Sequence, residues 1–589
     1  MRNAPVRLVV LLALAAAHSP ASAADVDVTV ESAPRGQATH GYSEILIRVV
    51  NKSSESHEVR LTYPKTTYSY GDNIRSVTRT VKVDAGGNLR VSLAWPEKHS
   101  VMGDGLGVAV DGREFEHAIP VGGSRGYRSY GSVRGGLILY SRTVDTRFPD
   151  WMRIGAAATN EYIRSESEIG LWSPNWVAYT RYDGVVVTEA DLRTMPAEVK
   201  AAIGQYVECG GALLVLGAKS PLPGNWKLTR APGAILHHSA AGFGICQVVA
   251  NPELLQFWRP EYARIHEAWT ATLTPWQRDR APAEANRLFP VVEDVGIPVR
   301  GLVAVMFAFV ILIGPVNLIV LARKKRKLWM FWTVPVVSFF TCLLVLGYMA
   351  ATEGWQGRAR AECFTILDEN SRRASTIGWT GFYTPLVPRG GLHFGTDTEV
   401  TYQNGQDPYG GYSYRRSSSS GSALSMEWSS EQHLSSGWLT PRVPSHFAVR
   451  KSELRRERVA FSRGADGQIE AVNGLGADVE TLWYMDEGGN LFRADGIAAG
   501  ERGTLKPAPL QQSAVSARSV APTLRSMYSG DWHNIVDRVK NDGVHLLAPR
   551  TYIAVLNAAP FTDEGMPGVS VRKTRSIVYG ILKENNDGG

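Results

Sequence analysis

The sequence predicts a multidomain, membrane-anchored protein with a β-sandwich, an α/β domain built on a parallel sheet, a two-helix transmembrane hairpin and a C-terminal mostly-β domain. Three observations support this prediction. Two long apolar runs, 301–322 and 328–351, are separated only by five consecutive basic residues. Short alternating segments with frequent turns fill residues 24–133. Continuous apolar segments are interspersed with a helical pattern in residues 134–250.

Residues 1–23 have the pattern of a secretory signal peptide. Arg2 and Arg7 form a basic start, residues 8–17 form a short apolar stretch, and Ala21-Ser22-Ala23 is a small-residue cleavage site. The apolar stretch is too short to cross a bilayer as a helix. We therefore expect the segment to be cleaved and the chain behind it to be exported.

Residues 24–133 predict a β-sandwich, because apolar and polar residues alternate over short segments that end in Gly, Asn and Asp clusters. The expected strands are 25–31, 43–50, 58–63, 77–83 and 89–95. Gly103-Asp104-Gly105-Leu106-Gly107 has glycines spaced as in a phosphate-binding loop. Since this segment opens onto a strand at 108–110 rather than onto a helix, it indicates a hairpin turn.

Residues 134–250 predict an α/β domain, because buried strands on both sides of a helix are typical of a parallel sheet. The expected strands are 137–140, 185–187, 213–216 and 244–249. Between them, an apolar stripe from Val199 to Val207 predicts a helix that ends at Gly210-Gly211. Residues 251–300 are expected to form a connector to the membrane, with a helix over 253–269.

The apolar runs 301–322 and 328–351 are each long enough to span a bilayer, since about 20 helical residues cross its hydrocarbon core. Lys and Arg are retained in the cytoplasm, so 323–327 is predicted to be a cytoplasmic turn. Both flanking regions are then exported. Asn317 lies inside the first run; we expect it to hydrogen-bond the partner helix or to lie near the cytoplasmic interface, with gating or ligand binding as the alternative.

Residues 352–589 return to an alternating pattern and predict an exported β-rich domain. Within it, residues 404–421 are rich in Gly, Tyr, Ser and Arg and cannot bury a core. This segment is interpreted as a surface insertion, with a binding loop as the alternative.

The charge and the cysteines limit the function and the fold further. The net charge is +7, and the basic turn alone contributes five positive charges, so no surface for nucleic acid is expected. Cys209 and Cys246 lie in the same exported domain, in a compartment where a disulfide persists. The sequence leaves a disulfide between them and two separate buried thiols as open alternatives.

Several segments together resemble a family of bacterial membrane-anchored proteins with an exported glutamine-amidotransferase-like (class I GATase-like) domain. They are Trp172-Ser173-Pro174-Asn175-Trp176, Tyr182–Thr188, Tyr206–Gly217, Ile313-Gly314-Pro315-Val316-Asn317 and Val472-Asn473-Gly474-Leu475-Gly476. The resemblance implies a flavodoxin-like parallel sheet for the α/β domain. It also implies partner proteins, because this family is often found beside MoxR-type ATPases and von Willebrand proteins.

The catalytic pattern of an amidotransferase is missing from the sequence. An active enzyme needs a Cys on a strand-to-helix turn, with a His and an acid beside it. The corresponding turn, 217–220, contains no Cys, and Cys209 and Cys246 lie elsewhere. His237-His238 has no acid at a suitable spacing and no metal-ligand pattern. We therefore predict no catalytic residue, no metal site and no cofactor.

A small ligand would be expected in the crevice at the carboxyl ends of the parallel strands. The residues predicted at that edge are Ser141, Thr188, Glu189, Lys219 and Ser220.

The sequence leaves three hypotheses for the function. The first is an interaction or scaffold protein of the bacterial inner (cytoplasmic) membrane, without catalysis, whose exported domains bind other envelope or membrane proteins. The second is a degenerate α/β enzyme or a small-ligand sensor that uses the strand-end crevice. The third is glycan binding through Trp172 and Trp176, for which packing against the α/β core is the alternative.

Overall fold

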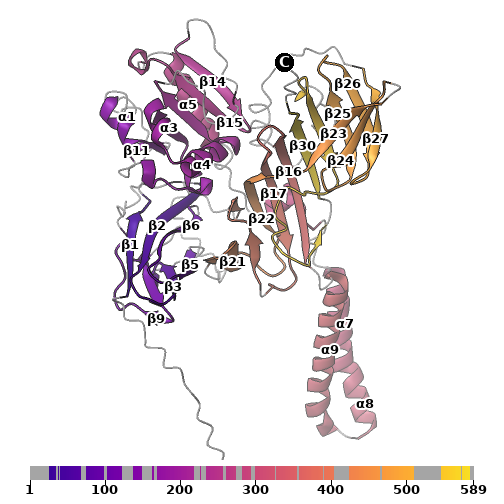
Figure 1. Ribbon diagram of the computed structural model, residues 1–589. Coiled ribbons are helices and arrows are strands. Elements are labelled where there is room, and N and C mark those ends of the chain that lie inside the picture. The colour runs from indigo at the N-terminus through magenta and orange to yellow at the C-terminus, as the bar shows by residue number, and fades with distance from the viewer. Residues whose placement is uncertain are drawn as a thin grey trace, which may run out of the picture.

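The computed structural model describes most of the chain outside the N-terminal segment and several loops. The described residues are 25–34, 38, 40–67, 74–97, 103–121, 137–148, 162–164, 169–217, 226, 234–255, 260–273, 282–292, 299–325, 327–353, 357–388, 390–403, 424–464, 467–509, 546–571 and 574–583. The predicted signal peptide, the 404–421 segment, Lys219 and Ser220 lie outside these residues. The protein is multidomain and consists mostly of β-sheet, with two apolar helices (Figure 1).

The N-terminal region is a pair of packed sheets. One sheet has the order β1 (Val26–Ser32), β2 (Tyr42–Asn51) and β6 (Asn88–Pro96). The facing sheet contains β5 (Ile74–Val83), β3 (His57–Tyr63), β8 (Gly107–Val110) and β9 (Arg113–Glu114). The short strands β4 (Thr66–Thr67) and β7 (Gly103–Asp104) pair with each other. The glycine segment at 103–107 opens onto strand β8 rather than onto a helix, as expected, but it is not the turn of a hairpin, because β7 pairs with β4 whereas β8 pairs with β3 and β9.

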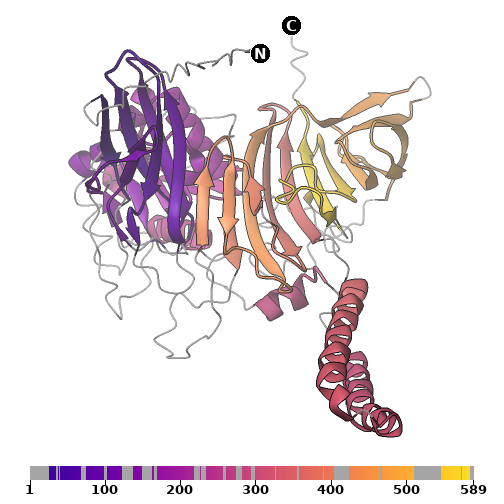
Figure 2. The same cartoon turned by 90° about the horizontal axis from the view of Figure 1, so that it is seen from below.

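The facing sheet does not end within the N-terminal region. It continues through β20 (Leu424–Trp428), β21 (Gln432–Ser436) and β18 (Leu392–Phe394), all of which follow the hairpin in sequence. Strand β20 pairs in parallel with β5, with Met426 opposite Val77, and Figure 2 shows these orange strands beside the indigo ones. The sequence-based division assigned 24–133 and 352–589 to separate domains, whereas the structure joins strands from both in one sheet.

The α/β region contains a sheet of order β11 (Tyr162–Arg164), β10 (Ile138–Tyr140), β12 (Gly184–Thr188), β13 (Ala212–Leu216), β15 (Gly244–Val249) and β14 (Leu236–Ala241). Neighbouring strands are parallel except for the antiparallel pair β14 and β15. Its helices include α1 (Arg142–Arg147), α3 (Glu189–Thr194) and α4 (Ala197–Glu208). Sequence analysis expected the strands on either side of α4 but not the antiparallel edge β14.

The connector to the membrane is interrupted rather than continuous. The helix expected over 253–269 is a 3-10 turn at Pro252–Leu254 and a separate helix, α5 (Pro260–Leu273), and Leu255 between them has an extended backbone. Pro260 begins α5 because proline has no N–H to donate within a preceding helix. Helix α6 (Pro282–Leu288) follows.

The C-terminal region forms a long sheet that curves along its length (Figure 1). Its order is β19 (Thr398–Gln403), β22 (Ser445–Leu454), β17 (Arg373–Tyr383), β16 (Arg358–Asp368), β30 (Arg575–Ile581), β28 (Thr551–Leu556), β25 (Val479–Met485), β26 (Leu491–Ile497), β27 (Arg502–Pro507), β24 (Ile469–Gly474) and β23 (Arg458–Arg463). The short strand β29 (Ser570–Val571) pairs with the beginning of β16.

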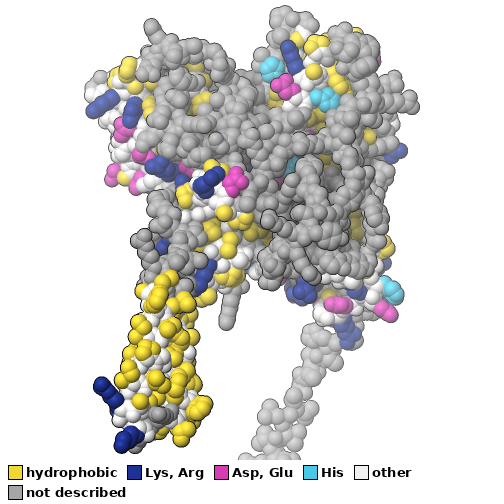
Figure 3. Space-filling model, turned by 180° about the vertical axis from the view of Figure 1, so that it is seen from behind, with side chains coloured by type: hydrophobic (Ala, Val, Ile, Leu, Met, Phe, Trp, Pro, Cys, Tyr) yellow, Lys and Arg dark blue, Asp and Glu magenta, His cyan; other side chains and the backbone are white. Residues whose placement is uncertain are grey.

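The hairpin consists of two apolar helical arms that extend away from the rest of the molecule. The first arm is α7 (Val299–Ile311), a π-helical turn at Leu312–Val316 and α8 (Asn317–Arg323); the second is α9 (Met330–Glu353). Pro315 lies inside the π-helical turn, and proline removes a backbone hydrogen bond there. Two helical segments, Val303–Arg323 and Met330–Gly347, are long and apolar enough to cross a membrane, and Figure 3 shows basic side chains at their tip.

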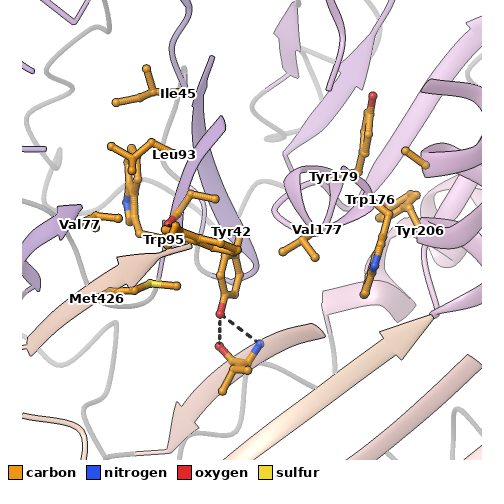
Figure 4. Close-up of a cluster of buried hydrophobic side chains, with 14 of the residues drawn as sticks. Tyr42, Ile45, Val77, Leu93, Trp95, Trp176, Val177, Tyr179, Tyr206 and Met426 are labelled. Carbon is orange, nitrogen blue, oxygen red and sulfur yellow. Dashed lines mark hydrogen bonds between the residues drawn. The ribbon is translucent and has the colours of Figure 1, made fainter. Parts of the chain in front are cut away.

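One hydrophobic core connects the sandwich, the α/β region and the first strands after the hairpin. It includes Trp95 and Leu93 of the sandwich, Trp176 and Tyr206 of the α/β region, and Met426 of β20 (Figure 4). Apolar burial contributes about 25 cal/mol per Å². These parts therefore stabilise one another, and together we call everything outside the hairpin the body.

Candidate functional site

The predicted strand-end crevice lies at the point where the order of the parallel sheet reverses. Strand β10 has β11 on one side and β12 on the other. Ser141 follows the carboxyl end of β10, and Thr188 is the last residue of β12. Such switch points are where open α/β sheets usually bind ligands. The structure therefore brings two of the predicted residues to the expected edge.

A third side chain, Asp191, already binds both of them. Its Oδ2 accepts a hydrogen bond from Ser141 Oγ at 2.6 Å and from the Thr188 backbone N–H at 2.8 Å. Its own N–H donates to Thr188 Oγ1 at 3.2 Å, which completes a capping box for α3. Ser141 Oγ accepts from the Val144 N–H at 3.3 Å and so caps α1. All three side chains are buried.

The hydrogen bonds described at this edge serve helix capping, so Ser141, Thr188 and Asp191 already have partners within the chain. Glu189 lies at the start of α3 and forms an ion pair with Arg193 at 2.8 Å. Sequence analysis missed Asp191, although Thr188-x-x-Asp191 has the spacing of a capping box. That spacing was the available signal for its role.

The two cysteines of the α/β region are separate, buried thiols. Cys209 ends α4 and Cys246 lies within β15. Burial raises the pKa of both thiols far above their ordinary value. A thiol that stays protonated is a poor nucleophile, so neither residue offers amidotransferase chemistry. Within the described residues, no group of three or more His, Cys, Asp or Glu side chains could hold a metal ion.

The indoles of Trp172 and Trp176 are buried in the shared core. Trp176 Nε1 donates to the Asp397 carbonyl oxygen at 3.0 Å. These two side chains therefore pack within the body and join its parts rather than stacking on a ligand.

A polar junction links the residues that precede the hairpin to those that follow it. Arg450 of β22 forms a buried ion pair with Glu399 of β19. Its Nη1 also donates to the Cys209 carbonyl oxygen at 3.2 Å, at the C-terminal end of α4, where a cation is favoured by the helix dipole. Arg373 of β17 approaches Glu208 at 3.4 Å.

Further hydrogen bonds extend this junction to the sandwich. The Tyr42 hydroxyl accepts from the Val400 N–H at 3.2 Å and lies 3.2 Å from the Val400 carbonyl oxygen (Figure 4). It donates to Gln432 Oε1 at 2.9 Å. Trp428 Nε1 donates to the Ala94 carbonyl oxygen at 2.6 Å. Each of these bonds joins one residue before the hairpin to one after it.

Both ends of the hairpin meet the body at one end of strands β16, β17 and β22, a place we call the hairpin base. On the way into the hairpin, Val291 and Val292 pack against Tyr383 at the end of β17. The Phe289 carbonyl oxygen accepts from His446 Nε2 at 3.0 Å. On the way out, Gly357 follows α9 by four residues and accepts from the Ser570 N–H at 3.1 Å.

Among the described side chains of the hairpin, a polar contact joins the two arms. Asn317 Nδ2 donates to Thr333 Oγ1 at 3.0 Å. This contact corresponds to the interhelical hydrogen bond expected for Asn317. Many large apolar side chains along both arms are exposed, among them Phe307, Phe339 and Phe340, and Figure 3 shows this apolar surface.

Comparisons with known proteins add little to this description. No family model matches the chain, and no curated protein matches it. Among solved structures, the chain is similar to a calcium-binding mutant of Bacteroides uniformis beta-glucuronidase 2, with 10% sequence identity and a TM-score of 0.10. The match covers 33% of this chain and 24% of that chain, so the chain spans about a quarter of that structure's length. A likeness this small carries no argument.

Proposed function

We propose that the protein is a scaffold of the bacterial envelope that is anchored in the inner membrane by its hairpin and presents a single exported body to partner proteins. In this proposal the hairpin spans the bilayer twice, and the segments before and after it lie in the periplasm. The protein carries out no catalysis of its own.

The pairing of β5 with β20 is the observation that carries this proposal. Strand β5 precedes the hairpin and β20 follows it, yet they are hydrogen-bonded neighbours over five residue pairs. A bilayer whose hydrocarbon core is about 30 Å thick cannot lie between two paired strands, which are about 4.8 Å apart. This pairing therefore supports a topology in which both flanking regions lie on the same side of the membrane.

The basic turn supports the orientation. Arg323, Lys324 and Lys325 lie at the tip of the hairpin, far from the body (Figure 3). Cationic turns are retained in the cytoplasm, which leaves the body outside. Only a short turn remains on the cytoplasmic side, so the proposed function depends on surfaces of the exported body.

The described residues of the α/β region favour a binding role over an enzymatic one, because their thiols and strand-end hydroxyls are buried or already bonded. We propose that this region is a flavodoxin-like domain of the GATase-like type, as the resemblance of segments such as Trp172–Trp176 implies. Its thiols are buried and its strand-end hydroxyls cap helices. A fold of this kind without a nucleophile offers mainly its surface, and other envelope or membrane proteins are the proposed partners.

A cysteine-accessibility experiment tests the topology. Cys342 is the exposed native cysteine and lies in the hairpin, while Cys209, Cys246 and Cys363 are buried. In a Cys342→Ser background, we expect Leu454→Cys on the body to react with an impermeant maleimide added to spheroplasts, which lack the outer membrane. Lys324→Cys at the tip is expected to react only after permeabilisation. Labelling of Lys324→Cys in sealed spheroplasts would contradict the proposed topology.

A crosslinking experiment tests the scaffold role. A photo-crosslinking residue is placed at exposed body positions, such as Leu171 and Leu454, in cells that express the protein at its native level. We expect discrete adducts with specific envelope proteins from some of these positions and none from the buried control position Leu213. An absence of protein adducts from all exposed positions of the body would contradict a scaffold.

A further inference from the structure

The hairpin base carries a group of exposed apolar side chains that the hairpin itself does not cover. They are Leu386, Val387, Val443 and Val571, and they expose 67%, 41%, 38% and 59% of their surface. We call these four residues the apolar rim. Contiguous exposed apolar residues on a soluble surface usually mark a contact with a partner or a membrane.

Backbone contacts hold the loops of the apolar rim together. Leu386 lies three residues beyond Tyr383, which pairs with Arg358 at the start of β16. Val571 pairs with Ala359, the next residue of β16. The Arg442 N–H donates to the Thr384 carbonyl oxygen at 2.8 Å, which places Val443 beside the Leu386 loop. All four side chains thus belong to one end of β16 and β17.

The same end lies within a short reach of the second helix of the hairpin. Helix α9 has 24 residues and is therefore about 36 Å long, which exceeds the roughly 30 Å hydrocarbon core. Four residue steps separate Glu353 from Gly357, and four steps cover at most about 14 Å. The start of β16 must then lie close to the headgroup layer, and Figure 3 shows hydrophobic side chains on the body beside the upper end of the hairpin.

We propose that the apolar rim rests in the headgroup region of the bilayer that the hairpin crosses, so that the body is held against the membrane surface. This inference rests on the proposed insertion of the hairpin. Lipid contact buries Leu and Val side chains that water otherwise surrounds, and the hydrophobic effect favours this burial.

Leu454 provides a matched control for the rim. It is exposed to 70%, close to the value for Leu386, but it pairs with Arg373 at the opposite end of β17. The eleven residues of β17 separate the two ends by roughly 33 Å at about 3.3 Å per residue. A label at Leu454 should therefore remain in water whether or not the rim touches lipid.

The test uses the full-length protein in liposomes with Cys342→Ser and one nitroxide label at a time. Labels are placed at Leu386→Cys, Val443→Cys, Leu454→Cys and Phe339→Cys, the last on the exposed face of the hairpin. Their accessibility to oxygen, which partitions into lipid, is compared with accessibility to a water-soluble nickel complex. We expect the oxygen-to-nickel ratio at Leu386 and Val443 to be several-fold higher than at Leu454 and lower than at Phe339.

The possible outcomes separate this inference from the proposed function. A high ratio at Phe339 with ratios at Leu386 and Val443 equal to that at Leu454 would overturn the lipid contact of the rim and leave the membrane anchor intact. A low ratio at Phe339 would overturn both, because the hairpin itself would then lie in water. Elevated ratios at both rim positions support the inference.

Discussion

The polar junction inside the body and the apolar rim at the hairpin base differ in whether their side chains already have partners within the chain. Arg450 at the junction is buried and bonded to Glu399 and to the end of α4. Leu386 in the rim is exposed and apolar. The difference indicates that the two halves of the chain bury each other's polar groups, whereas the apolar side chains of the rim stay exposed, and there we propose a contact with lipid.

The largest loss of stability is expected when the Arg450–Glu399 ion pair of the polar junction is removed. Arg450→Met leaves the Glu399 carboxylate buried without its cation, so the free energy of unfolding should fall by about 3–5 kcal/mol. Denaturant titration of the protein in detergent measures this loss.

Two variants control this prediction. Arg493→Met removes an exposed pair with Asp495 at 3.0 Å and should change the free energy of unfolding by only about 0–1 kcal/mol. Combining Arg450→Met with Glu399→Leu removes both charges and should recover much of the loss. Equal effects of Arg450→Met and Arg493→Met would mean that the junction does not depend on this pair.

The pH dependence of stability tests the role of His446, which lies at the hairpin base. Burial, with repulsion from Arg360, lowers the pKa of His446 to about 4, against the opposing effect of its hydrogen bond to Phe289. Between about pH 4 and 6.5 the unfolded chain binds a proton there that the folded protein does not, so stability falls as the pH falls. His446→Gln should remove up to about 1.4 kcal/mol per pH unit of this fall, as measured by denaturant titrations across the window.

Glu44 provides a control of opposite sign. Burial raises the pKa of Glu44 to about 7. The folded protein then holds a proton that the unfolded chain has lost, so stability contributed by this group falls as the pH rises from about 4.5 to 7. Glu44→Gln should remove that fall. Parallel pH profiles for wild type, His446→Gln and Glu44→Gln would refute both assignments.

A smaller effect is expected at the edge of the parallel sheet, where the polar groups are also bonded internally. Asp191→Ala removes the acceptor for Ser141 Oγ and for the Thr188 N–H, which should cost about 2 kcal/mol of unfolding free energy. Asp191→Asn keeps one oxygen and should cost less. If Asp191→Ala unfolded at the same temperature as wild type, the hydrogen bonds accepted by this carboxylate would not stabilise the edge.

The smallest effect on folding is expected at the rim. Leu386→Ser and Val443→Ser alter exposed side chains, and such surface changes usually stay within about 0.5 kcal/mol. Denaturant titration in detergent should therefore show wild-type stability. If the free energy of unfolding fell by more than about 1 kcal/mol, these side chains would be part of the core. The rim would then not differ from the polar junction in having its contacts outside the body.

Sequence patterns predicted the elements whose burial is local. The strand at Gly244–Val249 and the helix at Ala197–Glu208 were expected close to their observed bounds, the strand from a continuous apolar segment and the helix from an apolar stripe with helical spacing. The two arms of the hairpin were expected because each apolar run is long enough to span a bilayer. The candidate site was predicted only in part. Ser141 and Thr188 lie at the expected edge, but Asp191, which is hydrogen-bonded to both, was not predicted.

By itself, the sequence determined the order of these elements and the two apolar helices, since hydrophobic periodicity and the basic turn are properties of neighbouring residues. Only the tertiary structure decided that β20 extends the sheet of β5, that Arg450 closes the end of α4, and that the rim loops meet beside α9. These contacts join residues that are far apart in the sequence, by more than 200 positions for Arg450 and the end of α4. The sequence of a strand indicates which of its faces is buried. It does not indicate which strand lies beside it, because the backbone N–H and C=O groups at its edges can pair with any strand of suitable length.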